Sequence, residues 1–307
     1  MRIIFMGTPD FAVPTLNALV EAGHEIVAVV AQPDRPKGRG QKMVSPSTVD
    51  RARELGIPTK QPRAVRKGPF VDWMTTAGAD VAVVVAYGRI LIPALLQAPR
   101  LGCINVHASL LPKYRGAAPI NWALVNGETE SGVCTMQMAE GLDTGDVLLK
   151  VRTPVPPDET AGELYGRLAA LGATLAVDTL AQLETLEAQP QDHPNHTLAP
   201  LIDRAAAQID WTQSASDIHN LVRGFNPWPS AWTHLGTERL KVHRTRVVDG
   251  KGVPGTVISA GSPVRVAAGT GAVELEQVQL PGKRAQSGLD LMNSGRLTEG
   301  MVLGKET

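Results

Sequence analysis

Cysteine and long apolar runs are scarce in this chain of 307 residues, and each shortage excludes a class of protein. Two cysteines, Cys103 and Cys134, cannot build a disulfide framework, so we interpret both as buried thiols in a reducing compartment. No apolar run reaches the roughly 18 residues of a membrane-spanning helix, and the apolar start at residues 3–6 is too short for a signal peptide. We therefore expect a cytoplasmic globular protein with no membrane contact, made of one large or two ordinary domains.

The chain also lacks the loops that mark nucleotide and metal chemistry. Residues 7–11, directly after the first apolar run, read Gly-Thr-Pro-Asp-Phe instead of Gly-x-Gly-x-x-Gly, which argues against a dinucleotide site. Neither a Walker-type loop nor a nucleophile elbow is present. His193 and His196 lie in a proline-rich segment, where solvated histidines are commoner than metal ligands, so we expect no metal.

An excess of charge of either sign is missing as well, since 30 basic residues balance 30 acidic ones. This balance argues against a strongly basic nucleic-acid binder, but the charges are unevenly spread. Residues 35–67 hold ten Lys or Arg and two acidic residues, whereas residues 128–192 hold twelve acidic and three basic residues. The first stretch is suited to meeting phosphate, and the second fits a solvated acidic face.

What the sequence does contain is an alternation of short apolar runs with helical patterns, which predicts βαβ units and a parallel sheet. Residues 3–6, 26–31 and 81–86 are nearly continuous runs rich in Val and Ile, as expected for strands buried on both faces. Further strands are predicted near residues 103–106, 133–138 and 146–151, with helices near residues 117–125 and over residues 159–187. The predicted fold class is therefore α/β, a Rossmann-like mixed, mostly parallel sheet with helices on both faces.

Prolines at positions 190, 194 and 200 end the last helical pattern, because proline can neither continue a helix nor donate to a strand ladder. We interpret residues 190–206 as a linker between a catalytic domain, residues 1–189, and a second domain, residues 207–307. The second domain has one short helix predicted near residues 216–223. It continues with short strands punctuated by glycine, the pattern of a small β-barrel.

Residues 102–107 read Gly-Cys-Ile-Asn-Val-His, where polar and apolar side chains alternate. Asn105 and His107 therefore share one face of a predicted strand, roughly 6 to 7 Å apart, at its carboxyl end. Ligands bind at that end of open α/β sheets, so an amide and an imidazole would converge there on one small polar group. The alternative is that both are core polar side chains bonded to backbone, and the spacing alone leaves the two interpretations open.

Three motifs in this region make the chain similar to a known family. The Asn-x-His pair, Ser-Leu-Leu-Pro at residues 109–112 and the downstream Asp143 resemble the folate-dependent formyltransferases. Other segments resemble, within that family, the methionyl-tRNA formyltransferases. They are residues 6–11 (Met-Gly-Thr-Pro-Asp-Phe), 32–40 (Gln-Pro-Asp-Arg-Pro-Lys-Gly-Arg-Gly) and 225–232 (Phe-Asn-Pro-Trp-Pro-Ser-Ala-Trp). With these segments the resemblance extends over essentially the whole chain.

The resemblance implies transfer of the formyl group of 10-formyltetrahydrofolate to the free α-amine of methionyl initiator tRNA, for translation initiation. It assigns Asn105 and a protonated His107 as donors to the oxyanion, and Asp143 as the acceptor of the amine's proton. The residues that it implies contact folate are Ser109, Leu110, Leu111 and Pro112. By spacing alone Asp143 is more simply a turn former between glycines, and Asp146 competes with it for the catalytic role.

The basic stretch is the first of two regions that the resemblance links to tRNA. Residues 34–46 would enter the acceptor arm, with Lys37, Arg39 and Lys42 as contacts. We expect Arg39 to matter most, because its planar fork reaches phosphate or a guanine edge bidentately. Solvated side chains are the plainer interpretation of such a loop.

The second domain is the other region, and the resemblance implies an OB-like barrel that binds the charge of the tRNA backbone. Arg223, Lys283 and Arg284 are its candidate phosphate contacts. We expect Trp228 and Trp232, flanked by prolines, to be packing anchors and not to stack on bases. We also expect the protein to be a monomer.

Two places depart from the family pattern. Many relatives carry a lysine and an acidic pair where this chain has Leu201, Arg204, Ala205 and Ala206. Gln41 stands in the basic stretch where a basic residue is common. What either place contributes to tRNA binding is therefore left open.

Three other functions also stay open. A formyltransferase for a nucleotide-sugar amine would share Asn105, His107 and Asp143 but would not need the basic stretch at residues 35–67. A purine-pathway formyltransferase would not need a second barrel domain. A non-catalytic RNA-binding protein on a retired enzyme scaffold would not need the three polar side chains intact.

Overall fold

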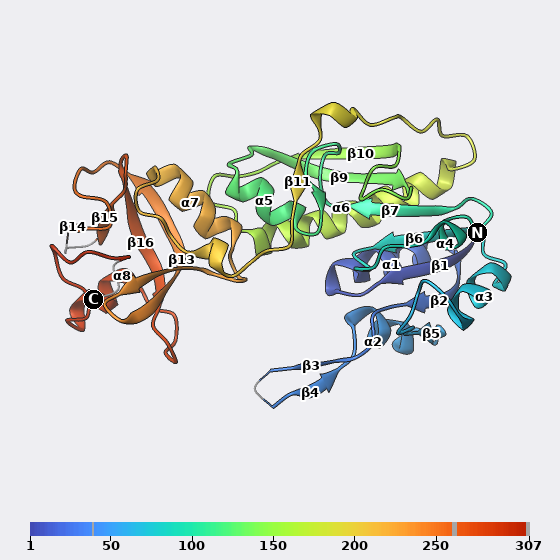
Figure 1. Cartoon of the computed structure of the whole chain (residues 1–307), viewed down its shortest axis with the longest axis horizontal. Helices are drawn as coiled ribbons and strands as arrows, with labels where there is room; N and C mark the ends of the chain where they lie inside the picture. Colours follow the sequence, from blue (N-terminus) through green and yellow to red (C-terminus); the bar gives the residue numbers. More distant parts are fainter. Residues whose placement is uncertain (39, 260–262, 305–307) are drawn as a thin grey trace. The chain divides into compact units, whose positions relative to one another are not determined.

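The structure is a computed structural model that describes residues 1–38, 40–259 and 263–304 (Figure 1). The chain divides into two compact units. The first comprises Met1–Pro119, Ser131–Thr153 and Tyr165–Ala199, and the second comprises Ile120–Glu130, Pro154–Leu164 and Pro200–Thr307. The second unit therefore takes in two short segments that precede residue 165 of the chain. The domain boundaries predicted at residues 189 and 207 stay a prediction.

A seven-stranded sheet lies at the centre of the first unit, in the order β10-β9-β7-β6-β1-β2-β5. Its strands are β1 (Arg2–Gly7), β2 (Glu25–Val30), β5 (Thr59–Lys60), β6 (Val81–Val85), β7 (Cys103–His107), β9 (Glu130–Gln137) and β10 (Val147–Pro154). Neighbouring strands from β5 to β7 are parallel, and β9 runs antiparallel to β7. The predicted mixed, mostly parallel sheet is confirmed, with strands at the apolar runs.

Helices cover both faces of this sheet. They are α1 (Val13–Glu21), α2 (Ser47–Glu54), α3 (Pro69–Thr76), α4 (Pro93–Leu96) and α6 (Ala161–Gln182), with a 3-10 turn, η1 (Asp10–Ala12), before α1. The helix α5 (Pro119–Val125) falls almost entirely in the second unit. On one face, Ile4 of β1 packs in an apolar cluster with Met74 of α3 and Leu95 of α4. On the other face α6 comes so close that a Cβ at Gly172 would lie 2.9 Å from Val106 Cγ1 of β7. Alternation along the strands gives each face its own apolar side chains.

The long helix is shorter than its leucine pattern predicts. The pattern extends to residue 187, but α6 ends at Gln182 and both Leu183 and Leu186 lie beyond it. Leu183 N bonds to Leu180 O, and Thr185 N bonds to Gln182 O. These bonds span three residues instead of four, so the α-helical ladder tightens into a turn and stops.

The predicted linker is largely bonded to the first unit. Residues 190–206 include η2 (His193–Asn195), η3 (Ala205–Ala207), which ends one residue beyond them, and the short strand β11 (Leu198–Ala199). β11 runs parallel to β8 (Arg115–Gly116). Proline prevents a long ladder here, but isolated backbone groups still find partners. We call residues 189–199 the crossing segment.

A separate hairpin opens the basic stretch. It consists of β3 (Arg35–Lys37) and β4 (Lys42–Val44), which pair antiparallel. In Figure 1 the hairpin projects away from the seven-stranded sheet of its unit.

The second unit is built on a five-stranded antiparallel sheet in the order β12-β13-β16-β15-β14. Its elements are β12 (Ala231–Leu235), β13 (Glu238–Val248), β14 (Val257–Ser259), β15 (Arg265–Ala267), β16 (Ala272–Gln279) and the helices α7 (Ala215–Gly224) and α8 (Gly288–Asn293). Residues 300–304 join its two edges, because Val257 N of β14 donates to Met301 O and Gly304 N donates to His234 O of β12. The predicted OB-like barrel is confirmed, with α7 where the short helix was predicted.

The described residues contain neither a membrane-spanning helix nor a metal cluster. Over these residues, no helix combines the length and the apolar character needed to cross a bilayer. No three of their His, Cys, Asp or Glu side chains gather as the ligands of a metal ion would.

Candidate active site

β7 carries Asn105 and His107 to the carboxyl end of the sheet, and the two side chains share one face. Val106, between them, faces α6 on the other side. Asn105 is paired in register with Val84 of β6, and His107 with Cys134 of β9. The pair therefore lies inside the sheet, where neighbouring strands on both sides of β7 fix its backbone.

Asp143 reaches these two side chains from the loop between β9 and β10. Asn105 Nδ2 lies 3.4 Å from Asp143 Oδ1, and His107 Nδ1 lies 3.7 Å from Asp143 Oδ2. The His107 and Asp143 side chains are only 6% and 14% exposed. The competing residue, Asp146, instead lies directly before β10, and its backbone carbonyl accepts from Gln137 N. The structure thus brings the three predicted catalytic side chains together.

The ring of His107 is held at its other nitrogen. Nε2 lies 2.9 Å from the carbonyl oxygen of Tyr114, which can only accept, so Nε2 carries a proton. A neutral ring would then turn the lone pair of Nδ1 toward the Asp143 carboxylate, whereas an imidazolium turns an N–H toward it. The Tyr114 carbonyl thus fixes the ring with Nδ1 facing Asp143.

Asp143 is held in an unusual backbone conformation. Its φ of +50° lies in the left-handed region, which costs a residue other than glycine about 1–3 kcal/mol and persists only where the surroundings impose it. Its Oδ2 accepts a hydrogen bond from Gly116 N at 2.8 Å. Two residues on, a Cβ at Gly145 would overlap the carbonyl oxygen of Gln137. The loop is therefore pressed against the end of β9, and only glycine fits there.

Sequence reasoning missed two buried polar residues behind this loop. Gln191, 7% exposed, donates from Nε2 to the carbonyl oxygens of Asp143 and Gly145, at 2.9 and 2.6 Å. Its Oε1 accepts from Nε and Nη2 of Arg115 at 3.1 and 2.7 Å, and Arg115 is 4% exposed. Gln191 stands among prolines and polar residues, so nothing in its sequence neighbourhood signals its burial.

The Ser-Leu-Leu-Pro segment forms a closed turn directly after β7. Ser109 is 2% exposed, and its Oγ donates to the carbonyl oxygen of Lys113 at 2.7 Å. Leu111 is buried, whereas Leu110 and Pro112 are half-buried. The hydroxyl of Ser109 therefore stabilises its own turn, and contact of the four residues with folate stays a prediction.

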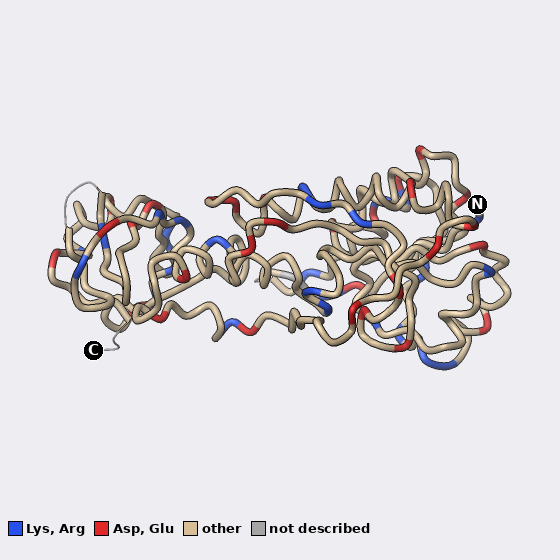
Figure 2. The backbone as a smooth tube through the Cα atoms, turned by 90° about the horizontal axis from the view of Figure 1, so that it is seen from above, with Lys and Arg blue, Asp and Glu red and all other residues tan. Residues whose placement is uncertain are grey.

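The predicted tRNA loop coincides with the β3–β4 hairpin. Figure 2 marks the described Lys and Arg of the whole chain in blue. Lys42 is exposed at the start of β4, and the adjacent Met43 is 58% exposed. Lys37 ends β3, but its side chain lies outside the described part, as does the whole of Arg39. The contact predicted for Arg39 therefore stays a prediction.

The three residues predicted to bind tRNA in the barrel differ in exposure. Lys283 and Arg284 are exposed in the turn after β16. Arg223 is 6% exposed, and its Nε and Nη1 donate to Asn220 Oδ1 and Pro156 O at 2.8 and 3.3 Å. Burial lowers the pKa of its guanidinium from the ordinary value. Arg223 thus ties α7 to the neighbouring segment of its own unit and offers little surface to a phosphate.

The two tryptophans near this helix behave differently. Trp232 is buried in a cluster with Ala207 and Phe225, and the Arg239 guanidinium lies 3.9 Å from its ring centre, so the predicted anchor is confirmed. Trp228 is 54% exposed, so the prediction that it is an anchor is wrong. The turn around it is closed by Ser230, whose N donates to Phe225 O and whose Oγ donates to Pro227 O, both at 2.9 Å.

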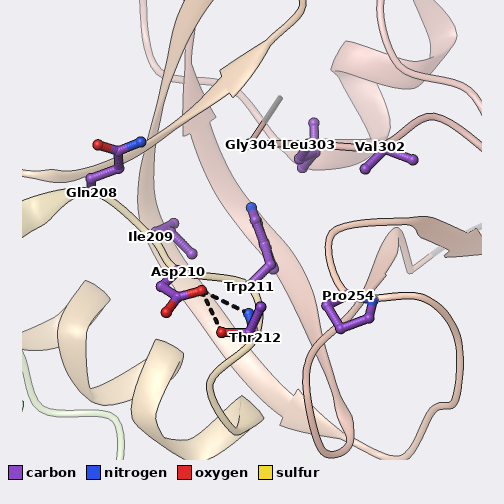
Figure 3. Close-up of a pocket in the computed structure, with 9 residues that line it drawn as sticks. All are labelled: Gln208, Ile209, Asp210, Trp211, Thr212, Pro254, Val302, Leu303 and Gly304. Carbon is purple, nitrogen blue, oxygen red and sulfur yellow. Dashed lines mark hydrogen bonds between the residues drawn. The ribbon is translucent and has the colours of Figure 1, made fainter. Parts of the chain in front are cut away.

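A pocket of about 460 Å³ lies within the second unit (Figure 3). Its lining residues are Gln208, Ile209, Asp210, Trp211, Thr212, Pro254, Val302, Leu303 and Gly304. The Asp210 carboxylate accepts from Thr212 N and Thr212 Oγ1 at 3.0 and 2.7 Å, which lowers its pKa. The Asp210 carboxylate therefore closes the turn in which it lies. The predicted catalytic residues all belong to the other unit, so this pocket is separate from them.

Comparison with known proteins relates both parts of the chain to formyl transferases. Residues 1–180 match the formyl transferase family, and residues 201–296 match the formyl transferase C-terminal domain. An N-formyltransferase from Helicobacter canadensis, solved with folinic acid and dTDP-3-aminofucose, gives a TM-score of 0.64 at 17% identity over 89% of this chain and 98% of that chain. HypX from Aquifex aeolicus, solved with tetrahydrofolic acid, gives 0.61 at 18% identity over 96% of this chain and 47% of that chain. These two similarities show the fold.

Curated relatives are similar along nearly their whole length. The methionyl-tRNA formyltransferase of Roseobacter denitrificans is 51% identical over 302 residues, which cover 98% of each chain. That of Geobacter metallireducens is 48% identical over 307 residues, which cover 99% of each chain. Similarity of this extent includes both units, so the chain belongs to the methionyl-tRNA formyltransferase family of enzymes.

Proposed function

We propose that this enzyme transfers the formyl group of 10-formyltetrahydrofolate to the free α-amine of methionyl initiator tRNA. The observation that carries the proposal is the convergence of an amide, an imidazole and a carboxylate, from Asn105, His107 and Asp143, at the end of β7. Membership of the family supports the tRNA substrate. The folates held by two solved proteins of the same fold support the class of donor.

The first step makes an oxyanion, which needs donors. The amine nitrogen attacks the formyl carbon, a C–N bond forms, and the carbonyl electrons move to oxygen. Asn105 Nδ2 has a second hydrogen besides the one toward Asp143. An imidazolium at His107 can turn Nδ1–H to the oxyanion, because Asp143 Oδ2, 3.7 Å away, lies beyond hydrogen-bonding distance. One such donor typically lowers the barrier by about 2.7–4 kcal/mol.

The second requirement is to move a proton. Asp143, as a carboxylate, accepts the proton of the attacking amine directly or through a water. When the intermediate collapses, the bond between the formyl carbon and N10 of the folate breaks, and N10 takes up the proton. One proton therefore passes from the attacking amine, by way of Asp143, to N10 of the folate. No covalent bond to the enzyme is formed.

We assign the two substrates to different sets of residues. Ser109, Leu110, Leu111 and Pro112 are our proposed folate contacts, next to His107. Lys42, Lys283 and Arg284 are our proposed phosphate contacts on the tRNA, together with Lys37 and Arg39 of the hairpin. Arg223 is left out because it is buried. Translation takes place in the cytoplasm, which stays our predicted location, and a monomer stays our predicted state.

Formyl transfer from labelled 10-formyltetrahydrofolate tests the proposal. The acceptors are methionyl initiator tRNA, methionyl elongator tRNA and a nucleotide-sugar amine, each at a low and a high salt concentration. We expect product with the initiator tRNA, at a rate that falls with salt because phosphate contacts release counterions. Transfer to the sugar alone would refute the tRNA acceptor, and no transfer to any acceptor would favour a retired enzyme scaffold.

A further inference from the structure

The crossing segment, residues 189–199, lies along the two loops that build the active site. Its first residue, Gln189, forms two backbone bonds of 2.8 Å with Val147. Toward its end, Thr197 Oγ1 accepts from Tyr114 N at 2.8 Å, and Ala199 O accepts from Ala117 N at 2.8 Å. Between these anchors the segment carries a side chain that reaches the loop of Asp143.

That side chain is Gln191, and all its hydrogen-bonding capacity is used. An amide has two N–H donors and an oxygen with two lone pairs. Both donors are spent on the carbonyl oxygens of Asp143 and Gly145, and both lone pairs accept from Arg115. No other uncharged side chain of this length offers two donors on one side and two acceptor sites on the other.

Arg115 fixes the direction in which this amide points. Its guanidinium can only donate, so it binds the oxygen of Gln191 and turns the Nε2 group toward the loop. Arg115 Nη2 also lies 3.0 Å from His193 Nδ1 of the crossing segment. The next residue in the chain, Gly116, donates its N–H to the carboxylate of Asp143. Asp143 is thus held at its carbonyl and at its carboxylate by one local assembly.

The backbone of Asp143 needs such support. A left-handed residue other than glycine costs free energy, and in this conformation Asp143 Oδ2 lies 3.7 Å from His107 Nδ1. We propose that Gln191, backed by Arg115, is a positioning residue that holds Asp143 against His107 and Asn105. The inference rests on the proposed function, in which Asp143 accepts the amine's proton.

Gln191→Glu tests the inference, because it keeps the acceptor for Arg115 and removes both donors to the loop. Gln189→Glu is the matched control, the same change in the same segment at an exposed side chain. We expect kcat of Gln191→Glu to fall by roughly 10- to 100-fold, the effect of a displacement of about 1 Å. The KM values for folate and tRNA, and the activity of Gln189→Glu, stay within about two-fold of wild type. An unchanged kcat would overturn the inference.

A double variant separates positioning from general damage. If Gln191 acts through Asp143, then Gln191→Glu lowers kcat far less in an Asp143→Asn background than in wild type. Equal losses in the two backgrounds would overturn the inference. Gln191→Met, uncharged and of similar length, replaces Gln191→Glu in the same cycle if the added charge unfolds the protein.

Amide exchange of residues 141–145, read by mass spectrometry, tests the same bonds without turnover. We expect faster exchange in Gln191→Glu than in Gln189→Glu, and equal exchange would contradict the inference. Two other results would refute the proposed function itself: wild-type protein that makes no formylated tRNA, or an Asp143→Asn protein that is as fast as wild type. The inference alone fails if Asp143→Asn is slow while Gln191→Glu is normal.

Discussion

His107 Nδ1 lies 3.7 Å from Asp143 Oδ2, within the range of an ion pair but longer than a hydrogen bond. The same carboxylate oxygen is already bonded to Gly116 N at 2.8 Å. Catalytic hydrogen bonds commonly shorten only when substrate is bound. The carboxylate is therefore fixed from one side and free to serve the ring or an incoming amine from the other.

Replacing Asp143 by Asn separates the charge of this side chain from its shape. Asn keeps an oxygen that can accept from Gly116 N, but it cannot take a proton, so we expect single-turnover formylation to slow by at least about 100-fold. Asp146→Asn, three residues away, is the control and should stay within about two-fold of wild type. If Asp143→Asn keeps the wild-type rate, the proton acceptor lies elsewhere.

Alanine substitutions at two glycines of α6 should change the free energy of unfolding in opposite directions. A Cβ at Gly172 would press on Val106 Cγ1, and overpacking of a core costs about 1–3 kcal/mol. Gly166 is exposed with open space around it, so Gly166→Ala should gain about 0.5–1 kcal/mol from helix propensity. Urea unfolding of the two variants checks both signs.

Gly172→Ala should also slow formyl transfer, since Val106 stands between Asn105 and His107 on β7. Gly166→Ala serves as the control for activity. A Gly172→Ala protein as stable and as active as wild type would mean that α6 can retreat from β7 without cost.

Replacing Arg284 and replacing Arg223 by alanine should have different effects, because only Arg284 is exposed. Arg284 is exposed, so Arg284→Ala should weaken tRNA binding and reduce the salt slope by about one, with no change in unfolding. Arg223→Ala should lower the free energy of unfolding by about 2 kcal/mol, because its packing and two hydrogen bonds are lost. Binding measured against salt, beside urea unfolding, distinguishes the two. If Arg223→Ala changes the salt dependence of tRNA binding, Arg223 contacts the tRNA after all.

The two thiols should be inert in the folded protein. Burial raises the pKa of Cys103 from 9.0 to about 12 and that of Cys134 from 9.0 to about 11, so neither forms the reactive thiolate near neutral pH. We expect an alkylating reagent to modify both only after unfolding, as mass spectrometry would show. Rapid labelling of the native protein would contradict the buried positions.

The same shifts give a dependence of stability on pH. Above pH 9.0 a thiol of the unfolded chain loses its proton while the buried thiol keeps it, so the unfolded state becomes more favourable. Stability should therefore fall as pH rises from about 9 toward 11. The fall should shrink in a Cys103→Ala Cys134→Ala protein, and an identical fall would assign it to other groups.

Part of the site could be predicted from the sequence because the residues concerned are neighbours in the chain. Alternation at residues 102–107 places Asn105 and His107 on one face of a strand, whatever the strand packs against. The leucine pattern of α6 likewise predicts a helix but overruns its end, because periodicity continues where the backbone ladder has already tightened.

Other features depend on residues far apart in the chain. Gln191 lies in a proline-rich stretch with no periodic pattern, and its burial follows only from its bonds to Arg115 and to the loop of Asp143. A linker and a crossing segment have the same local composition, so composition cannot distinguish them. Arg223 is likewise a candidate phosphate contact by sequence, and only its bonds to Asn220 and Pro156 in the folded unit reveal its burial.

The sequence by itself therefore determined the α/β class, the barrel, the family and the polar pair on β7, because periodicity and motifs are properties of neighbouring residues. Only the tertiary structure decided that Asp143 meets this pair in a left-handed turn, and that Gln191 and Arg115 hold it there. The physical reason is that a hydrogen bond requires a direction and a distance in space, and folding alone brings together groups that the chain keeps apart.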